Sequence, residues 1–411
     1  MKEKINIAII GLGCRGTDLL NKILLPQTDV EIVGVCDSYG DRVEEACKKI
    51  SEKTGKNAFA TSDYKQVLDI NGLDAVVIST AWEYHLKIAI HALKKGVAVA
   101  LEVGGAFSLE ELWELVRTQE KTKTPFMFME NCCFDKSELL ATAMVRKGVL
   151  GTIVHMEGAY SHDLREEIAG GAKNRHYRLR NYLYRNCENY PTHEIGPIAK
   201  ILDINRGNRF VSLVSVASKA VGMKEYALEN AEKYPELNGL EFNQGDIVTT
   251  VITCANGETV TIKLDTTLPR FYTRNFIVRG TKGFYEQNTN TVFLDGPHDD
   301  AYDPAIMYRR YLENGKDYEK EYLPEFWQII TSEQLSAGHG GMDYFIFRNF
   351  IDSIKSGTEP CIDVYDAATW MAISVLSEQS IKNGGAPICF PDFTDGKWMM
   401  RQRKDVCQFK L

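Results

Sequence analysis

Apolar positions in the first third of the chain form short continuous runs separated by amphipathic stretches. The runs are residues 5–10, 30–36, 75–79, 97–101 and 125–129. The stretches between them repeat apolar side chains at a helical spacing, and they include residues 42–50, 82–95 and 109–120. Short apolar strands joined by helices are typical of a parallel sheet that is covered on both faces. The pattern predicts a doubly wound α/β domain, a Rossmann dinucleotide-binding domain, over residues 1–131.

After about residue 150 the pattern changes to longer strands with alternating apolar and polar positions. They are residues 152–160, 211–218, 246–254, 258–265, 276–280 and 283–286, with a hairpin turn at Ala255-Asn256-Gly257. Two helices follow at residues 343–356 and 365–382. We therefore expect a second, α+β domain over residues 132–411, with a largely antiparallel open sheet and C-terminal helices that can pack back on the first domain.

Residues 299–340 show no clear periodicity. We expect a long loop here, and long loops in compact enzymes are often functional or mobile.

Composition and charge narrow the class of protein. The 411 residues exceed the roughly 250–300 over which one core grows, which agrees with two domains. No apolar run approaches the roughly 20 residues of a membrane helix, and the first residues enter a strand without a signal peptide. The net charge of −8 argues against a nucleic-acid partner. The ten cysteines show no zinc-binding spacing, so we expect reduced thiols, no metal and a cytoplasmic location.

A glycine-rich turn provides the strongest local motif. The first predicted strand leads into Gly11-Leu12-Gly13-Cys14-Arg15-Gly16, and a helix is expected to start near Thr17. Such glycines let the backbone approach a pyrophosphate, and the helix N-terminus offers amide donors to the phosphates. The second strand ends at Asp37, whose carboxylate suits a ribose diol and repels a 2′-phosphate. The motif predicts NAD rather than NADP, the alternative being a glycine turn without a ligand.

With this motif in place, the first 155 residues resemble the Gfo/Idh/MocA family of glucose–fructose oxidoreductases and inositol dehydrogenases. The supporting stretches are residues 76–80 followed by Trp82-Glu83-Tyr84-His85, then Leu93-Lys94-Lys95-Gly96, and Leu101-Glu102. The motif and the resemblance together imply the cofactor-binding residues Gly11, Gly13, Cys14, Arg15, Gly16, Asp37, Arg42, Thr80, Trp82, His85, Glu102, Val103 and Asn131. Most dehydrogenases of that family carry Glu-Lys-Pro where this chain has Glu102-Val103-Gly104. The missing lysine argues against a simple sugar dehydrogenase.

A narrower resemblance runs nearly from end to end, to the NAD-dependent glycosidases of glycoside hydrolase family 109, which include α-N-acetylgalactosaminidases. The matching stretches are residues 129–133, 160–165, 189–193, 265–270, 339–343, 363–367 and 390–393. Two positions depart from the family pattern: Glu194 replaces a usual glycine, and Phe134 replaces a usual tyrosine. Both leave the substrate range open.

The resemblance implies hydrolysis through a transient redox step, an exception among glycosidases. C3 of the sugar is oxidised, C1–C2 elimination expels the leaving group, water adds, and C3 is reduced again. The NAD would accordingly stay tightly bound and be recycled.

Histidine and tyrosine residues at the family's positions are the candidates for this chemistry. His193 is the first choice for the base near C3, since imidazole titrates near neutral pH. Tyr190 would orient a hydroxyl, and Tyr272 would transfer a proton at C2 or at the leaving group, helped as a base by Arg270, Arg274 or Arg178. The remaining candidates are the further catalytic residue Tyr160 and the substrate-binding residues His162 and Arg178.

Several alternatives remain at this level. The chain could be a net sugar oxidoreductase, forming a 3-keto glycoside or acting as an inositol or sugar dehydrogenase, or a non-catalytic dinucleotide sensor. Structural roles compete with functional ones for a group of aromatic residues, histidines and cysteines: His85, His91, Tyr182, Tyr184, His339, Cys132 and Cys133. We expect a small sugar glycoside as substrate, no membrane partner, and a homo-oligomer formed through the open sheet.

Overall fold

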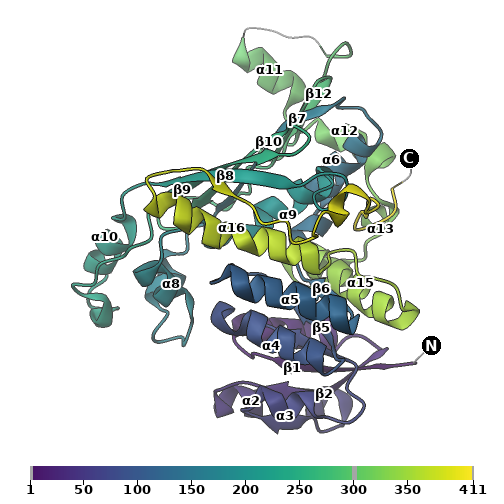
Figure 1. Cartoon of the computed structure of the whole chain (residues 1–411), viewed down its shortest axis with the longest axis vertical. Helices are drawn as coiled ribbons and strands as arrows, with labels where there is room; N and C mark the ends of the chain where they lie inside the picture. The colour runs from purple at the N-terminus through teal and green to yellow at the C-terminus, as the bar shows by residue number, and fades with distance from the viewer. Residues whose placement is uncertain (1–2, 299–302, 410–411) are drawn as a thin grey trace. The chain divides into compact units, whose positions relative to one another are not determined.

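A computed structural model describes residues 3–298 and 303–409 of the chain (Figure 1). Its contacts divide the chain into two compact units. The first consists of Met1–Asn131 and Ile330–Ala368, and the second of Cys132–Ile329 and Thr369–Leu411. The first unit therefore combines the N-terminal third of the chain with a segment that comes some 200 residues later.

The first unit contains a six-stranded parallel sheet in the order β3-β2-β1-β4-β5-β6. Its strands are β1 (Ile5–Ile10), β2 (Val30–Cys36), β3 (Phe59–Thr61), β4 (Ala75–Ile78), β5 (Ala98–Leu101) and β6 (Phe126–Phe128). Strands β4 and β5 are buried along their whole length, which explains why their sequences are continuously apolar. The predicted doubly wound α/β fold is confirmed.

The helices of this unit connect the strands and come from both of its segments. They are α1 (Cys14–Asp18), the π-helix η1 (Leu19–Leu24), α2 (Gly40–Thr54), α3 (Tyr64–Leu68), α4 (Trp82–Lys94), α5 (Leu109–Thr122), α14 (Ser332–Ser336), the 3-10 turn η4 (His339–Gly341) and α15 (Met342–Ser356). Ion pairs join the later segment to the start of β2, because Arg348 and Lys355 both bind Asp29, each at 2.9 Å. Helix α16 (Val364–Lys382) begins in the first unit and continues into the second.

The second unit contains an eight-stranded sheet in the order β13-β12-β11-β7-β10-β9-β8-β14 (Figure 1). Its strands are β7 (Ile153–Ser161), β8 (Phe210–Ala217), β9 (Ile247–Cys254), β10 (Thr259–Asp265), β11 (Ile277–Gly280), β12 (Gly283–Glu286), β13 (Thr291–Leu294) and β14 (Ile388–Cys389). Only the pair β7–β10 is parallel. The predicted, largely antiparallel sheet is confirmed, including the β9–β10 hairpin around Gly257.

Further helices of this unit are mostly short. They are η2 (Asn131–Phe134), α6 (Lys136–Arg146), α7 (Arg165–Ala169), α8 (Arg178–Tyr184), α9 (Thr192–Ile201), α10 (Gly222–Glu229), η3 (Pro235–Leu237) and η5 (Lys397–Met399). Helix α9 lies directly on β7. An added Cβ at Gly158 would come within 2.8 Å of the Glu194 Cβ and 3.0 Å of the Ile198 Cδ1. The missing side chain on β7 is therefore what lets α9 approach the strand.

The expectation of a long loop over residues 299–340 is wrong for the described part of that segment; residues 299–302 lie outside it. Four helices occupy the rest: α11 (Pro304–Tyr311), α12 (Gly315–Tyr322), α13 (Glu325–Gln328) and the helix α14 of the first unit. Capping stabilises two of them, since Asp303 accepts from the Ala305 amide and Thr331 forms a capping box with Gln334. Few of their residues are buried, so they lack the apolar stripe that reveals a helix in a sequence.

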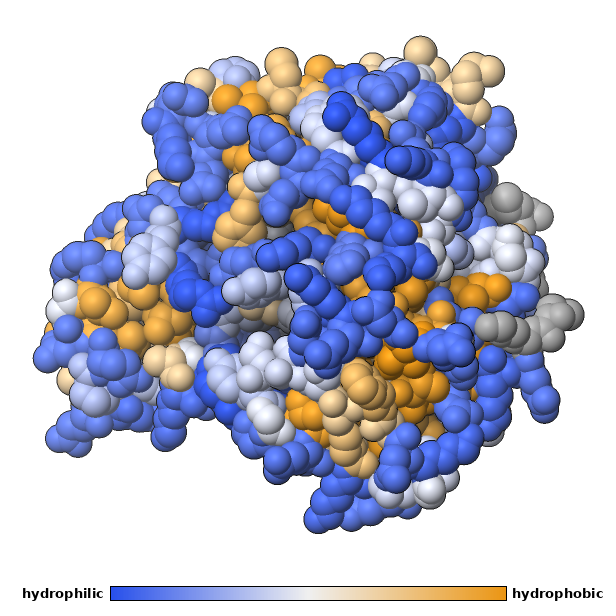
Figure 2. All heavy atoms as spheres, turned by 60° about the horizontal axis from the view of Figure 1, so that its bottom comes forward, coloured by the Kyte–Doolittle hydropathy of each residue, from blue (hydrophilic) through white to orange (hydrophobic). Residues whose placement is uncertain are grey.

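Figure 2 shows a face on which hydrophilic residues predominate and hydrophobic residues gather in separate areas. Within the described parts of the chain, no helix combines the length and hydropathy needed to cross a membrane.

The contact at Gly158 leads to a prediction about stability. Replacing Gly158 by alanine forces α9 away from β7, and such overpacking typically costs about 1–3 kcal/mol. Urea unfolding should show this loss for Gly158→Ala. Gly40→Ala is the matched control, because a Cβ at Gly40 would meet nothing within 4 Å. Equal stability of the two variants would contradict the packing argument.

Candidate functional site

The glycine-rich turn of the first unit lies tightly against the backbone that follows β4. Gly11 has a φ of +99°, and a Cβ there would lie 2.6 Å from the Ser79 carbonyl. A Cβ on Gly16 would lie 1.9 Å from the Gly11 oxygen. At Gly13 the nearest atom to an added Cβ is the Arg42 Nη1 at 3.7 Å. The helix begins at Cys14, earlier than the predicted start near Thr17, and becomes the π-helix η1 after five residues.

Asp37 stands at the end of β2, where the sequence placed it. Its carboxylate is 8% exposed and accepts the backbone amides of Leu12, at 2.6 Å, and Tyr39, at 2.9 Å. Arg42 lies beside it, with 3.6 Å between Nη1 and Oδ2. Each carboxylate oxygen retains a second lone pair. Asp37 thus fixes the glycine turn and keeps acceptor capacity for a ribose diol.

Arg15 connects the glycine turn to two acidic side chains of the first unit, Glu102 and Asp343. Its guanidinium donates to Glu102 at 2.8 and 3.1 Å and to both oxygens of Asp343 at 2.6 and 2.9 Å. Asp343 also accepts from Asn131 Nδ2 at 2.8 Å and lies 2.8 Å from the ring nitrogen of His339. Bidentate arginine–carboxylate pairs fix geometry as well as charge. The sequence predicted Arg15, Glu102 and Asn131 but gave Asp343 no role.

Trp82, His85 and Thr80 form a second group at the start of α4. The His85 Nε2 lies 2.9 Å from the Thr80 carbonyl, while its Nδ1 is buried without a hydrogen-bond partner among the described residues. Trp82 is buried against Gly104, where a Cβ would lie 2.4 Å from the indole ring. This contact explains why the chain carries glycine after Val103. An orphaned ring nitrogen beside the glycine turn fits a polar group of a bound dinucleotide.

The predicted catalytic and substrate-binding residues all belong to the second unit, and the structure brings them together. Tyr160 is central: its ring centroid lies 4.5 Å from that of Tyr190, 5.5 Å from His193 and 6.3 Å from Tyr272. The hydroxyl of Tyr190 lies 3.3 Å from the His193 Nε2, and the hydroxyl of Tyr160 lies 3.4 Å from the His162 Nδ1. We call Tyr160, His162, Arg178, Tyr190, His193 and Tyr272 the aromatic cluster.

Strand β7, helices α8 and α9 and the loops beside them supply the cluster. Tyr160 is near the end of β7 and His162 follows it, while His193 is in the first turn of α9 and Arg178 opens α8. Arg178 lies over the Tyr190 ring, 5.0 Å from its centroid, and pairs with Glu167 at 2.6 Å. The close seating of α9 on β7 therefore brings His193 to Tyr160.

Burial controls the ionisation of the cluster. It raises the pKa of the Tyr160 hydroxyl, against the attraction of the Arg178 cation. It also raises the pKa of Tyr272, whose hydroxyl is desolvated although 45% of the residue is exposed. The pKa of His162 is lowered, again by burial first. The expectation that nearby arginines give Tyr272 a lowered pKa is wrong, because desolvation outweighs the charge of Arg274. Tyr272 is thus a neutral hydroxyl.

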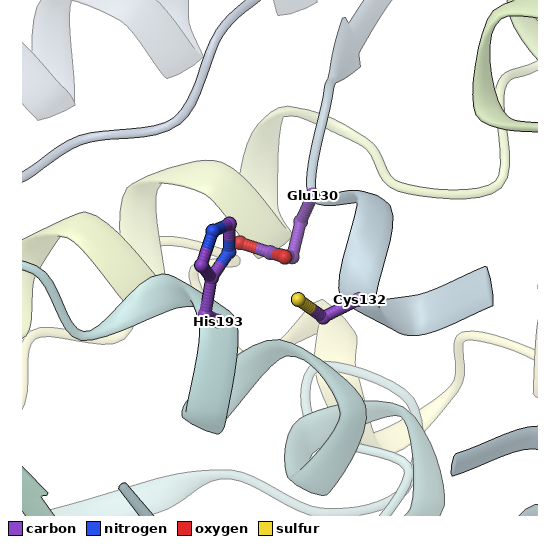
Figure 3. Close-up of side chains that lie close together, drawn as sticks. All are labelled: Glu130, Cys132 and His193. Carbon is purple, nitrogen blue, oxygen red and sulfur yellow. The ribbon is translucent and has the colours of Figure 1, made fainter. Parts of the chain in front are cut away.

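Cys132 lies beside this cluster (Figure 3). Its thiol points toward the His193 imidazole, and the two potential ligand atoms are within 4.8 Å of one another. Glu130, also drawn there, is one of the last residues of the first unit. The cysteine is a neighbour of the cluster that spacing along the chain could not reveal.

Sequence reasoning missed the acidic residues that hold the arginines. Arg274 binds Glu138 at 2.8 Å and Asp135 at 3.0 Å, and Arg178 binds Glu167. Glu138 is fully buried on α6, far from Arg274 in sequence. The available signal in the sequence was an acidic residue, Glu138, directly before the mostly apolar residues 139–145 of α6.

Comparison with known proteins identifies the family. Residues 5–129 match an oxidoreductase family with an NAD-binding Rossmann fold, and residues 134–400 match the C-terminal domain of glycosyl hydrolase 109. A glycosyl hydrolase family 109 protein of Stenotrophomonas maltophilia is 38% identical, over 99% of this chain and 92% of that protein. An alpha-N-acetylgalactosaminidase of Tannerella forsythia is 36% identical, over 97% and 88% of the two chains.

The chain belongs to glycosyl hydrolase family 109. The suspected family membership is confirmed, and the protein is a glycosidase with an oxidoreductase-like fold. Solved structures share that fold at low identity. A levoglucosan dehydrogenase in complex with NADH and levoglucosan has a TM-score of 0.69 and 19% identity, covering 95% of this chain and 100% of that one. A Lactobacillus casei myo-inositol dehydrogenase has a TM-score of 0.64 and 14% identity, covering 95% and 99%.

The two departures from the family 109 pattern lie in packed positions. The Glu194 side chain is buried, and its Cβ packs against Gly158 between α9 and β7. Phe134 is buried as well, and its carbonyl accepts the Trp327 indole at 2.9 Å. The individual roles of the site residues stay predictions.

The geometry at Asp37 predicts how this family 109 member selects its cofactor. Asp37→Asn keeps an acceptor for the Leu12 amide but removes the charge that repels a 2′-phosphate. NADP affinity should rise relative to that of NAD, by about tenfold, a change of about 1.4 kcal/mol. Titration calorimetry with both dinucleotides measures the ratio, and an unchanged ratio would show that Asp37 does not discriminate.

Buried His85 predicts a pH-dependent stability. Burial lowers the pKa of His85 to about 4, while an unfolded histidine titrates near 6.5. The unfolded chain therefore binds the additional proton first. Stability from this residue is complete above about pH 6.5 and falls, by about 3 kcal/mol, as the pH drops toward 4. Denaturant unfolding of His85→Gln should show a flatter profile between these pH values; a profile parallel to the parent's would refute the assignment.

Proposed function

We propose that this family 109 member hydrolyses glycosides through transient oxidation at C3 of the sugar, with a tightly bound NAD that is recycled. The observation that carries the proposal is the aromatic cluster, in which phenols and imidazoles are the groups able to transfer protons near neutral pH. Direct displacement at a glycosidic bond relies on a pair of carboxylates. Phenols and imidazoles instead suit proton transfers among sugar hydroxyls and the C2–H bond.

The first unit supports a resident dinucleotide. Asp37 would hold the adenosine ribose, the glycine turn would receive the pyrophosphate at the start of α1, and the His85 Nδ1 would accept a polar hydrogen. When bound, NAD supplies reversible hydride acceptance at C3 of the sugar. Because Arg15 is held by Glu102 and Asp343, the loop that cradles the cofactor is fixed. A fixed loop fits a cofactor that is retained between turnovers.

The second unit supports the proton transfers. His193 would accept the proton of the 3-hydroxyl, and the Tyr190 hydroxyl, 3.3 Å from its Nε2, would orient it. A ketone at C3 acidifies the C2 proton, so its removal permits departure of the group on C1. Tyr160 and His162 would bind sugar hydroxyls from the end of β7, and Arg178 would bind a polar substituent. Water then adds at C1, and C2 regains its proton.

An α-N-acetylgalactosaminide is the first substrate to test, since the relatives in Tannerella forsythia and Shewanella oneidensis are named alpha-N-acetylgalactosaminidases. Purified enzyme without added NAD should release phenol from the aryl glycoside without net accumulation of NADH. Stoichiometric NADH would favour a net sugar oxidoreductase, and bound NAD without turnover on a wide panel of glycosides would favour a dinucleotide sensor.

The variant His193→Asn tests the proposed base. It should lower kcat/KM by about 10²–10⁴-fold, the usual contribution of general acid–base catalysis.

Loss of label at C2 tests the elimination route directly. A C2-deuterated substrate should exchange its deuterium with solvent during turnover, as mass spectrometry of the product would reveal. Full retention of deuterium would exclude elimination.

We also propose that the protein is a cytoplasmic homo-oligomer that pairs through the outer face of its eight-stranded sheet. Exposed Val216 and Val251 on neighbouring strands β8 and β9 support this, because apolar side chains on a sheet face favour association. Light scattering should detect an oligomer, and Val251→Glu should weaken it. A monomeric parent, or its recovery outside the cell, would contradict these two expectations.

A further inference from the structure

Arg274 occupies a buried position behind the aromatic cluster and donates in three directions. Its Nε lies 2.8 Å from the Glu138 Oε1, its Nη2 lies 3.0 Å from the Asp135 Oδ2, and its Nη1 lies 3.2 Å from the Tyr272 hydroxyl. Arg274 is 6% exposed and Glu138 is 1% exposed. Two of these three interactions therefore fix the guanidinium on acidic side chains, and the third is a hydrogen bond to Tyr272, a predicted catalytic residue.

The anchors are themselves fixed by secondary structure. Glu138 is in the first turn of α6, and its Oε1 also accepts from Gln287 Nε2 at 3.0 Å. Asp135 is the N-cap of the same helix and accepts the Ser137 amide at 2.9 Å. Helix α6 thus holds the guanidinium through two acidic side chains, whose oxygens accept hydrogen bonds from the buried cation.

A guanidinium can only donate hydrogen bonds. The bond from Arg274 must therefore end on a lone pair of the Tyr272 oxygen, so the hydroxyl hydrogen of Tyr272 points away from Arg274. The Tyr272 ring lies 5.2 Å from that of His162 and 6.3 Å from that of Tyr160, measured between centroids. Burial raises the pKa of Tyr272, which keeps this hydrogen in place at neutral pH.

We propose that Arg274 is a positioning residue that aims Tyr272 as the proton donor to the departing glycosidic oxygen and stabilises the phenolate that remains. The inference rests on the proposed function. As the C1–O bond breaks, its electron pair goes to the glycosidic oxygen, which takes the proton from the Tyr272 hydroxyl. The electron pair left at C2 forms the C1=C2 double bond. When water adds, its oxygen bonds to C1 and one of its protons returns to Tyr272. The electron pair of the C1=C2 bond takes up a proton at C2 from the base that removed it.

This role predicts a dependence on the leaving group that a merely structural arginine would not produce. Dinitrophenolate leaves without a proton, whereas an alkoxide needs one. Arg274→Gln should therefore lower kcat/KM at least 100-fold for a methyl glycoside and less than threefold for the dinitrophenyl glycoside of the same sugar. Exchange of the C2 deuterium of the substrate with solvent protons, measured in H₂O, should continue near the parent rate. Tyr272→Phe should show the same pattern, and Arg274→Lys should recover part of the loss.

Matched variants keep the test interpretable. Arg279→Gln removes an exposed arginine that lies over the Phe284 ring on the neighbouring strand β12, and its activity should equal the parent's on every leaving group. Two further variants serve if Arg274→Gln does not fold. Arg274→Lys keeps a cation beside Glu138. The double variant Glu138→Gln, Arg274→Gln removes both members of the buried pair.

Equal losses for all leaving groups, together with lost C2 exchange, would overturn the proposal and place Tyr272 at C2 instead. Unchanged kinetics in the Arg274 variants would overturn it as well. Failure of the proposed function is a separate result, because it appears in the parent enzyme as absent hydrolysis or retained C2 deuterium.

Discussion

The approach of helix α9 to strand β7 decides how the residues of the aromatic cluster lie relative to one another. Gly158 makes it possible, because any side chain there would occupy the space of the Glu194 Cβ. His193 is in the first turn of the helix and Tyr160 is the last residue but one of the strand, so this backbone contact sets their separation. Burial also raises the pKa of Tyr160, which keeps its hydroxyl protonated at neutral pH. Close packing therefore affects both the geometry of the cluster and the ionisation of Tyr160.

In the first unit, the ion pairs of Arg15 fix the glycine turn. Arg15 lies within the glycine turn. Its partner Glu102 directly follows strand β5, and its partner Asp343 is in helix α15, more than 300 residues later in the chain. Charged, bidentate hydrogen bonds hold these elements in one arrangement. The turn that approaches a pyrophosphate is consequently rigid before any cofactor binds. Rigidity of this kind favours a retained cofactor over one exchanged at each turnover.

The family resemblance and the site chemistry support each other at different levels. Membership in family 109 makes the protein a glycosidase, whereas the fold alone is shared with dehydrogenases at under 20% identity. The structure also shows arginine contacts to the tyrosines, which family membership alone does not reveal. Arg178 and Arg274 each pair with a glutamate and turn a remaining donor or charge toward a tyrosine.

Most strands of both sheets and the glycine turn could be predicted from the sequence, because apolar periodicity and short motifs are local properties. The short strands β3, β13 and β14 were missed. The residues of the aromatic cluster came from the family resemblance, and their roles stay predictions. The sequence missed the helices of residues 303–340, whose exposed faces carry no apolar stripe. It also missed Asp343, Glu138 and Glu167, because ion pairs between residues far apart in the chain leave no spacing to read. The ionisation of Tyr272 was predicted in the wrong direction. The number of nearby arginines can be guessed from sequence, but desolvation depends on how the chain packs, and only the tertiary structure decides it.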